Sequence, residues 1–234
     1  MSGTELRLLS AGAAQAVATE LMREIRAAAG VDVRATFQPV GVLKEKLLAG
    51  EPCDVVVSTA AMLEEFASDG RVSGATISTL GRVHTGIAVR LGENAPRIGT
   101  AEQLRASLAA AARVYVPDPE RSTAGIHVVK VLRALGLHEC VAPRLASYPN
   151  GAAAMAALAK STEDGSLGCT QVTEIKSTPG VVLVGTLPAE FELATPYSAA
   201  VCESARDPEL ARRFVNMLSG PDSHELRRAA GFET

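Results

Sequence analysis

The sequence predicts an α/β protein made of two Rossmann-like lobes joined by a hinge. Short apolar segments rich in Val, Leu and Ile alternate with segments that show the helical spacing of apolar residues, over nearly the whole chain. Small and polar residues follow the apolar segments, as expected for strand-to-helix turns. The 234 residues suffice for two small lobes, and 47% hydrophobic with 21% charged residues is typical of a globular core with a solvated surface.

The first third of the chain contains three successive strand–turn–helix units. The β-branched run at its third strand is typical of a buried parallel strand, and Gly30 and Gly50 stand where two helices are expected to end. The predicted elements are the strand Leu6–Leu9, the helix Ala14–Ala28, the strand Val31–Phe37, the helix Pro39–Ala49, the strand Asp54–Val57 and a helix from Ser58-Thr59 to about Ala67.

The rest of the chain continues this alternation. The predicted elements are the strand Gly86–Arg90, the helix Ala101–Ala111, the strand Val114–Val116, a helix ending near Leu135, the helix Gly151–Lys160, the strands Gly168–Val172 and Val181–Val184, a returning strand Tyr197–Cys202 and the helices Pro208–Ser219 and Ser223–Ala230. Right-handed crossovers place the strand-to-helix turns of a parallel sheet at one edge, where ligands of such sheets bind.

The order of these elements predicts how the two lobes are composed. Residues 1–82 with 198–234 are expected to form lobe 1, and residues 83–197 lobe 2, with a ligand cleft between them. Helix N-termini at the turns favour anions by about 0.3–1 kcal/mol each at exposed positions. We therefore expect the binding partner to be a small anion.

Composition excludes several other functions. The chain has no Trp, 3% aromatic residues and a net charge of −3, so neither base-stacking platforms nor a basic footprint for nucleic acid is expected. No segment approaches the ~18 apolar residues of a membrane span, so no membrane insertion is expected. Neither a metal motif nor a glycine-rich nucleotide-binding motif is present, so we expect no metal and no cofactor.

Compartment is inferred from the start of the chain and from its thiols. The first residues lack a basic segment followed by an apolar one, which predicts a cytoplasmic protein, or a periplasmic one if an export signal has been removed. Cys53, Cys140, Cys169 and Cys202 are widely spaced and are expected to be reduced core thiols. The oligomeric state is left open.

Several segments resemble one family over nearly the whole chain. LRLLSAGAAQAV, GVDVRATF and LKEKLLAGEPCDVVVST resemble the amino-terminal lobe of molybdate-type periplasmic solute-binding proteins. The resemblance implies the type II periplasmic-binding-protein fold, with two lobes, a hinge and an anion in the cleft. The later GCTQVTEI, GVVLVGTLPAEFE and YSAAV segments resemble a subgroup similar to aconitate isomerase, which moves a double bond in a tricarboxylate.

This chain departs from the molybdate-type pattern at two places. The resemblance implies a serine where this chain has Ala13, and a serine-rich turn where it has Gln38-Pro39-Val40-Gly41. Because hydroxyl groups expected to bond an oxyanion are absent there, a carboxylate is the expected ligand rather than molybdate.

Candidate binding residues lie at the predicted turns and crossings. Gly125 allows close backbone approach to a ligand, and an arginine at a hinge, such as Arg82, can hold a carboxylate through two hydrogen bonds. The predicted binding residues are Ser10, Gly12, Ala13, Gln38, Gly41, Ser58, Thr59, Arg82, Ser122, Thr123, Ala124, Gly125, Gln171 and Tyr197. A plain helix cap for Ser122–Gly125, strand ends for Ser10 and Ser58 and a surface position for Arg82 remain as alternatives.

Three residues are candidates for proton transfer, namely His84, His127 and Glu174. The functional hypothesis is a cofactor-independent cytoplasmic isomerase that shifts a double bond in a small polycarboxylate such as aconitate. The alternative is a non-catalytic carboxylate- or oxyanion-binding component of an ABC transporter or sensor.

Overall fold

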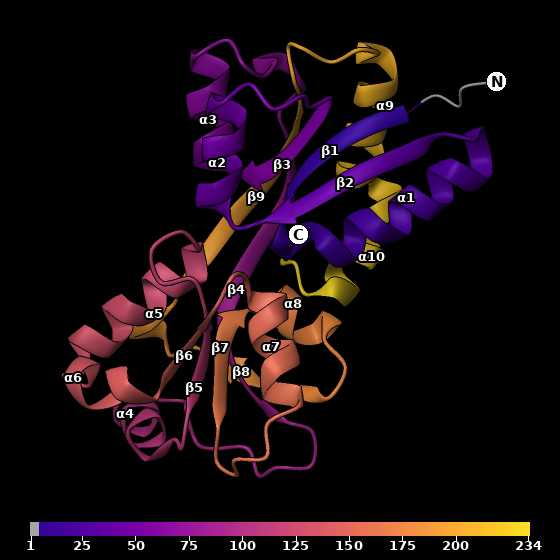
Figure 1. Ribbon diagram of the computed structural model, residues 1–234. Helices are drawn as coiled ribbons and strands as arrows, with labels where there is room; N and C mark the ends of the chain where they lie inside the picture. Colours follow the sequence, from indigo (N-terminus) through magenta and orange to yellow (C-terminus); the bar gives the residue numbers. More distant parts are fainter. Residues whose placement is uncertain (1–4) are drawn as a thin grey trace. The chain divides into compact units, whose positions relative to one another are not determined.

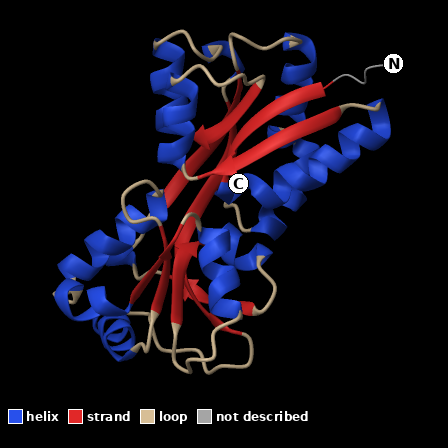
Figure 2. Ribbon diagram, in the orientation of Figure 1, coloured by secondary structure: helices blue, strands red, loops and turns tan. Residues whose placement is uncertain are grey.

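The computed structural model describes residues 5–234, which form two compact units (Figure 1). Unit 1 comprises the chain up to Arg82 together with Thr195–Thr234, and unit 2 comprises Val83–Ala194. The chain passes between them twice, within the strands β4 (Ser78–Arg90) and β9 (Ala194–Val201). Helices cover sheets in both units (Figure 2), so the predicted α/β class is confirmed.

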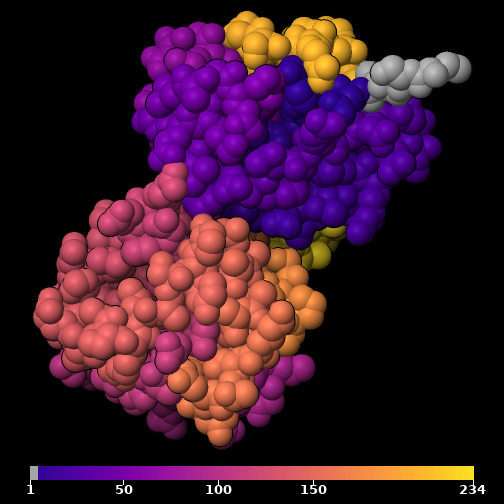
Figure 3. Space-filling view, viewed as in Figure 1, coloured from indigo at the N-terminus to yellow at the C-terminus, as the bar shows by residue number. Residues whose placement is uncertain are grey.

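Unit 1 is built on the sheet order β2-β1-β3-β9, in which β1, β2 and β3 are parallel and β9 is antiparallel to β3. Segments from both ends of the chain are therefore neighbours in this unit, as the adjoining indigo and orange surfaces in Figure 3 show. The helices and strands of unit 1 besides β9 and the first part of β4 have the following bounds: β1 (Glu5–Ala11), a 3-10 turn (Gly12–Ala14), α1 (Gln15–Ala29), β2 (Asp32–Gln38), α2 (Val40–Leu48), β3 (Val55–Thr59), α3 (Ala60–Ser68), α9 (Pro208–Ser219) and α10 (His224–Ala230).

Unit 2 is built on a sheet in which β6, β5 and β7 are parallel and β4 is antiparallel to both β7 and β8. Its elements besides β4 are α4 (Ala101–Ala110), β5 (Val114–Pro117), α5 (Thr123–Ala134), α6 (His138–Val141), β6 (Leu145–Tyr148), α7 (Gly151–Ala159), β7 (Leu167–Gln171), α8 (Val172–Ser177) and β8 (Val181–Thr186). Within residues 5–234, no helix is long and apolar enough to cross a membrane.

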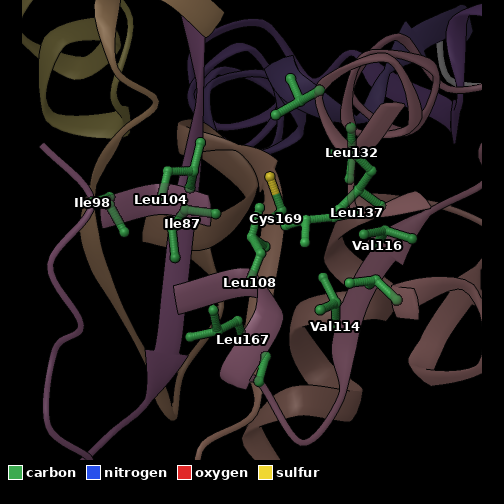
Figure 4. Packing of buried hydrophobic residues seen from close by; sticks show 14 of the residues in the cluster. Ile87, Ile98, Leu104, Leu108, Val114, Val116, Leu132, Leu137, Leu167 and Cys169 are labelled. Carbon is green, nitrogen blue, oxygen red and sulfur yellow. The ribbon is translucent and has the colours of Figure 1, made fainter. Parts of the chain in front are cut away.

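Each face of the unit 2 sheet packs against its own pair of helices. On one face, Ile87, Cys169 and Leu167 contact apolar residues of α4 and α5 (Figure 4). On the other face, Tyr115 contacts Met155 of α7 and neighbouring residues of α8. Because successive side chains of a strand point to opposite faces, these contacts indicate which way the residues of β7 and of β4 beside it point.

A buried ion pair holds β1 to the start of β3 in unit 1. Arg7 donates through two guanidinium nitrogens to Asp54 at 2.6 and 2.9 Å, and the backbone amides of Arg7 and Arg206 donate to the same carboxylate. Burial alone would raise the pKa of Asp54, but these hydrogen bonds outweigh it and lower the pKa to about 2.

Two parts of the fold differ from the sequence prediction. The strand predicted at Gly86–Arg90 is the second half of β4, which has 13 residues. Its first half carries Gly81, Arg82 and His84 among its apolar residues, and this interruption hides the strand pattern. The short elements α6 and β6 are also absent from the prediction, because four residues are too few to display a period.

Replacing Asp54 with Asn should lower the free energy of unfolding by about 2 kcal/mol, because Arg7 keeps its charge and loses its charged partner. The contribution of Asp54 is complete above its ordinary pKa of 3.8 and is lost as the pH falls towards 2. The difference in the free energy of unfolding between wild type and variant should therefore become smaller as the pH falls from 3.8 to 2. Urea denaturation at several pH values measures this difference.

Glu20→Gln is the control, because Glu20 forms an ion pair with Arg23 at an exposed position and should contribute less than about 1 kcal/mol. If both substitutions lowered the free energy of unfolding equally, the stabilising role of Asp54 would be contradicted.

Candidate anion site

The register of unit 2 brings several predicted residues to one edge of its sheet. Pro117 at the end of β5 pairs with Tyr148 at the end of β6, and Gln171 at the end of β7 pairs with Thr85 in β4. Both α5 and α7 begin just beyond this edge. Strand ends and helix N-termini therefore share one edge, as the parallel topology predicts.

The Ser122–Gly125 segment forms the start of α5. Ser122 is the N-cap, and its hydroxyl accepts from the Gly125 amide at 3.5 Å, which is at the long limit of a hydrogen bond. A side chain at position 125 would meet the carbonyl oxygens of Pro117 and Asp118. The missing side chain of Gly125 therefore lets the helix pack against the preceding loop, which accounts for the glycine without a ligand.

A carboxylate of the protein itself occupies the start of α7. Glu174 is 6% exposed, and it accepts the hydroxyl of Thr170 at 2.6 Å and the backbone amides of Gly151 and Ala152. Burial is the largest influence on Glu174 and raises its pKa, although these hydrogen bonds oppose the shift. A side chain at Gly151 would collide with both Glu174 and Thr170. This geometry favours a structural role for Glu174 over the predicted role in proton transfer.

Beside α5, the edge carries buried polar atoms without a hydrogen-bond partner in residues 5–234. They are both side-chain atoms of Gln171, which is 3% exposed, and the hydroxyl of Thr85, which is 1% exposed. Gln171 lies two residues after Cys169, and Thr85 lies two residues before Ile87. Both therefore point to the face that α5 covers, where Cys169 and Ile87 are packed. Orphaned polar groups cost free energy, so this pair marks a candidate site for a polar ligand.

The two candidate histidines contact consecutive residues of one short segment. His84 Nδ1 lies 2.8 Å from a carboxylate oxygen of Glu192. His127 Nε2 lies 2.7 Å from the carbonyl oxygen of Phe191, and a carbonyl can only accept, so His127 must be the donor there. Both rings therefore fix the segment that precedes β9, and their proposed role as proton carriers gains no support from these contacts.

Unit 1 brings its predicted residues to the matching edge of its own sheet. The register pairs Ala11 with Gln38 and Thr59 with Tyr197. The 3-10 turn and α2 begin after Ala11 and Pro39, which supply no capping side chain, so the first-turn amides around Gly12, Ala13 and Gly41 have no side-chain cap.

The side chains predicted to bind in unit 1 mostly have partners within that unit. Ser10 donates to the carbonyl of Ala11, Ser58 to the sulfur of Met62, and Thr59 accepts from the Met62 amide. Tyr197 is 2% exposed and packs edge-on against Phe232, which favours a core role over the predicted contact with a ligand.

Arg82 is engaged with the C-terminal segment of unit 1. Its guanidinium lies 3.1 Å from the Glu233 carboxylate, and the two backbones exchange hydrogen bonds of 2.7 and 2.8 Å. The arginine predicted to hold a carboxylate ligand is therefore paired with a carboxylate of the chain.

Sequence reasoning missed Thr85 and the cap of α7. Thr85 is a polar residue at the start of an apolar strand segment, which is a weak signal. The Pro149-Asn150-Gly151 sequence is a stronger one, because Asn150 is the N-cap and accepts from the Ala153 amide at 2.8 Å. Across residues 5–234, no group of three His, Cys, Asp or Glu side chains could hold a metal ion.

The chain is similar to one protein family and to two characterised proteins over nearly its whole length. A family model described as bacterial extracellular solute-binding protein matches residues 6–233. The aconitate isomerase of a Pseudomonas species is 26% identical over 236 residues, which cover 98% of this chain and 88% of that protein. The molybdate-binding protein ModA of Escherichia coli is 27% identical over 222 residues, which cover 94% of this chain and 84% of that protein.

The fold is also shared with solved structures. The periplasmic molybdate-binding protein of Azotobacter vinelandii superimposes with a TM-score of 0.79 at 18% identity, covering 98% of this chain and 99% of that one. The predicted resemblance and the two-lobed type II fold are confirmed. The expectation of a cytoplasmic protein gains no support, because the matching family is described as extracellular.

Replacing Gly151 with Ala should destabilise the protein by about 1–3 kcal/mol, because the added methyl group displaces Glu174 from the start of α7. Gly185→Ala is the matched control in the same unit, since a methyl group there meets only Ile98 at 3.6 Å. Chemical denaturation of both variants measures the effect. A loss no larger for Gly151→Ala than for Gly185→Ala would show that Glu174 does not fix the α7 terminus.

Proposed function

Because this chain belongs to the family of bacterial extracellular solute-binding proteins, we propose that it binds a small carboxylate anion at the edge of the unit 2 sheet. The proposal places the protein outside the cytoplasm, in keeping with the family, where it would serve as the binding component of a transporter or sensor. The observation that carries it is the pair of buried, unpartnered side chains Gln171 and Thr85 beside the α5 terminus.

The positive end of the α5 dipole supplies attraction for the negative charge. The amides of the first helical turn have no partner within the helix, and the long Ser122 contact leaves them only weakly capped. Since Glu174 takes the corresponding amides of α7, α5 is the better candidate of the two helix starts. Thr123 and Ala124 supply amides in this proposal, and Ser122 keeps its capping role.

The chemistry of Gln171 favours an organic carboxylate over a tetrahedral oxyanion. Its side chain presents a donor, Nε2, and an acceptor, Oε1, and both are buried without partners. A fully ionised molybdate offers acceptors only and would leave Oε1 unsatisfied. A ligand that carries a hydroxyl or a protonated carboxyl beside its carboxylate can pair with both atoms. Ala13 and the Gln38–Gly41 turn, which lack the hydroxyl groups of the molybdate-type pattern, favour the same choice.

The apolar substitutions Gln171→Leu and Thr85→Val test this proposal. Each should weaken binding of a hydroxycarboxylate such as citrate about 10- to 100-fold, the range for a lost hydrogen bond to a charged group. Neither should destabilise the free protein by more than about 1 kcal/mol, because the atoms they remove have no partner to lose. Titration calorimetry measures the first effect and thermal unfolding the second.

Thr162→Val is the control, because Thr162 is an exposed threonine before β7, at the end opposite Gln171. The panel should include citrate, both aconitates, molybdate and sulfate. If molybdate binds most tightly and Gln171→Leu has no effect, the choice of a carboxylate is wrong.

A second candidate function is isomerisation of aconitate, favoured by the 26% identity to the Pseudomonas aconitate isomerase over 98% of this chain. Such an isomerase must remove and return a proton next to a carboxylate. Of the three candidate residues, His84 is the best suited, since its side chain is 21% exposed and imidazole is a common general base.

An isomerase should exchange deuterium from heavy water into trans-aconitate, and His84→Gln should slow that exchange at least 100-fold. Proton magnetic resonance of the incubated substrate measures it. Binding of aconitate without any exchange would assign the protein to binding alone.

A further inference from the structure

Two of the four cysteines lie against each other in unit 1. Cys53, in the loop before β3, and Cys202, immediately after β9, are 1% and 3% exposed. The Cys53 thiol donates to the carbonyl of Val55 at 3.0 Å, and the Cys202 thiol interacts with the Cys53 sulfur. Cys169, by contrast, is packed among apolar side chains of unit 2, and Cys140 is exposed.

Backbone hydrogen bonds fix the segments that carry the two thiols. The Cys202 amide donates to the carbonyl of Asp54 at 3.0 Å, and the Ser204 hydroxyl donates to the carbonyl of Cys53 at 3.4 Å. Asp54 is itself anchored by its ion pair with Arg7. The ends of two neighbouring strands therefore bring the segments that carry the two buried thiols side by side.

We propose that Cys53 and Cys202 form a disulfide when the protein folds in an oxidising compartment. This inference does not depend on the ligand, although it draws on the extracellular location proposed above. It replaces the earlier expectation that all four cysteines are reduced core thiols, an expectation that followed from a cytoplasmic location.

The reaction is thiol–disulfide exchange with a disulfide donor such as oxidised glutathione. The thiolate of one cysteine attacks the donor, which forms a mixed disulfide and releases one thiol. The thiolate of the other then attacks the protein sulfur of the mixed disulfide, which closes the cross-link and releases the second thiol. The two protons lost by the cysteines end on the two released thiols, and the donor disulfide is the species that is reduced.

Oxidation is expected during folding rather than afterwards. Donation from the Cys202 thiol towards Cys53 and burial both raise the pKa of Cys202, so this thiol stays protonated and reacts slowly once the unit has folded.

The cross-link would close a loop that contains the whole of unit 2. About 150 residues separate the two cysteines, and Val83–Ala194 lie between them. Long loops lose the most unfolded-state entropy on closure, so the stabilising effect should be large. Unit 1, which is assembled from both ends of the chain, would stay covalently closed even while unit 2 unfolds.

The test is refolding of the full chain from urea in a buffer of oxidised and reduced glutathione, followed by alkylation under denaturing conditions. The refolded protein should have two alkylatable cysteines instead of four, and peptide mapping should join the peptides of Cys53 and Cys202. Its melting temperature should exceed that of the dithiothreitol-treated protein by roughly 5–15 °C.

Matched variants separate this pair from the other thiols. Cys140→Ala with Cys169→Ala should leave both the cross-link and the temperature difference unchanged. Cys53→Ala and Cys202→Ala should each abolish both, and circular dichroism establishes that they fold. Four alkylatable cysteines after oxidative refolding, or a cross-link through Cys140 or Cys169, would overturn the proposal. Because no ligand is involved, failure here is distinguishable from failure of the proposed function.

Discussion

The buried carboxylate of Glu174 determines how the binding edge of unit 2 is arranged. A charge removed from water must be satisfied by close hydrogen bonds, and Glu174 finds them in Thr170 and in the first amides of α7. The glycine at position 151 is required because any side chain there would enter this contact. The first amides of α7 are thus occupied from within, whereas those of α5 have only the long contact with Ser122.

The two proposals use opposite ends of the strands. In unit 2, the carboxyl ends of the parallel strands carry Gln171 and the start of α5, where polar groups without partners suit a ligand. In unit 1, the opposite end of β3 carries the Arg7–Asp54 pair and the contact between Cys53 and Cys202. The carboxyl end in unit 2 therefore carries unsatisfied polar groups, while the opposite end in unit 1 carries interactions that stabilise the fold.

Local patterns in the sequence were sufficient for the fold class and for most helix starts. Ser122 and Thr59 act as caps in the structure because capping depends on residues three positions apart. The roles of Glu174 and His127 could not be predicted in this way. Glu174 bonds a helix more than 20 residues earlier, and His127 bonds the carbonyl of Phe191, 64 residues away. Such partners are set by the order of strands in the sheet, and one sequence alone does not reveal that order.

We propose that an anion binds the first amides of α5 and the side chain of Gln171, while Glu174 keeps the first amides of α7. Heteronuclear magnetic resonance during a titration with citrate tests this directly. We expect the resonances of the Gln171 side-chain amide and of the Thr123 to Gly125 backbone amides to shift, and those of Gly151 and Ala152 to stay unchanged. Shifts centred on Gly151 and Ala152, with none at Gln171, would contradict it.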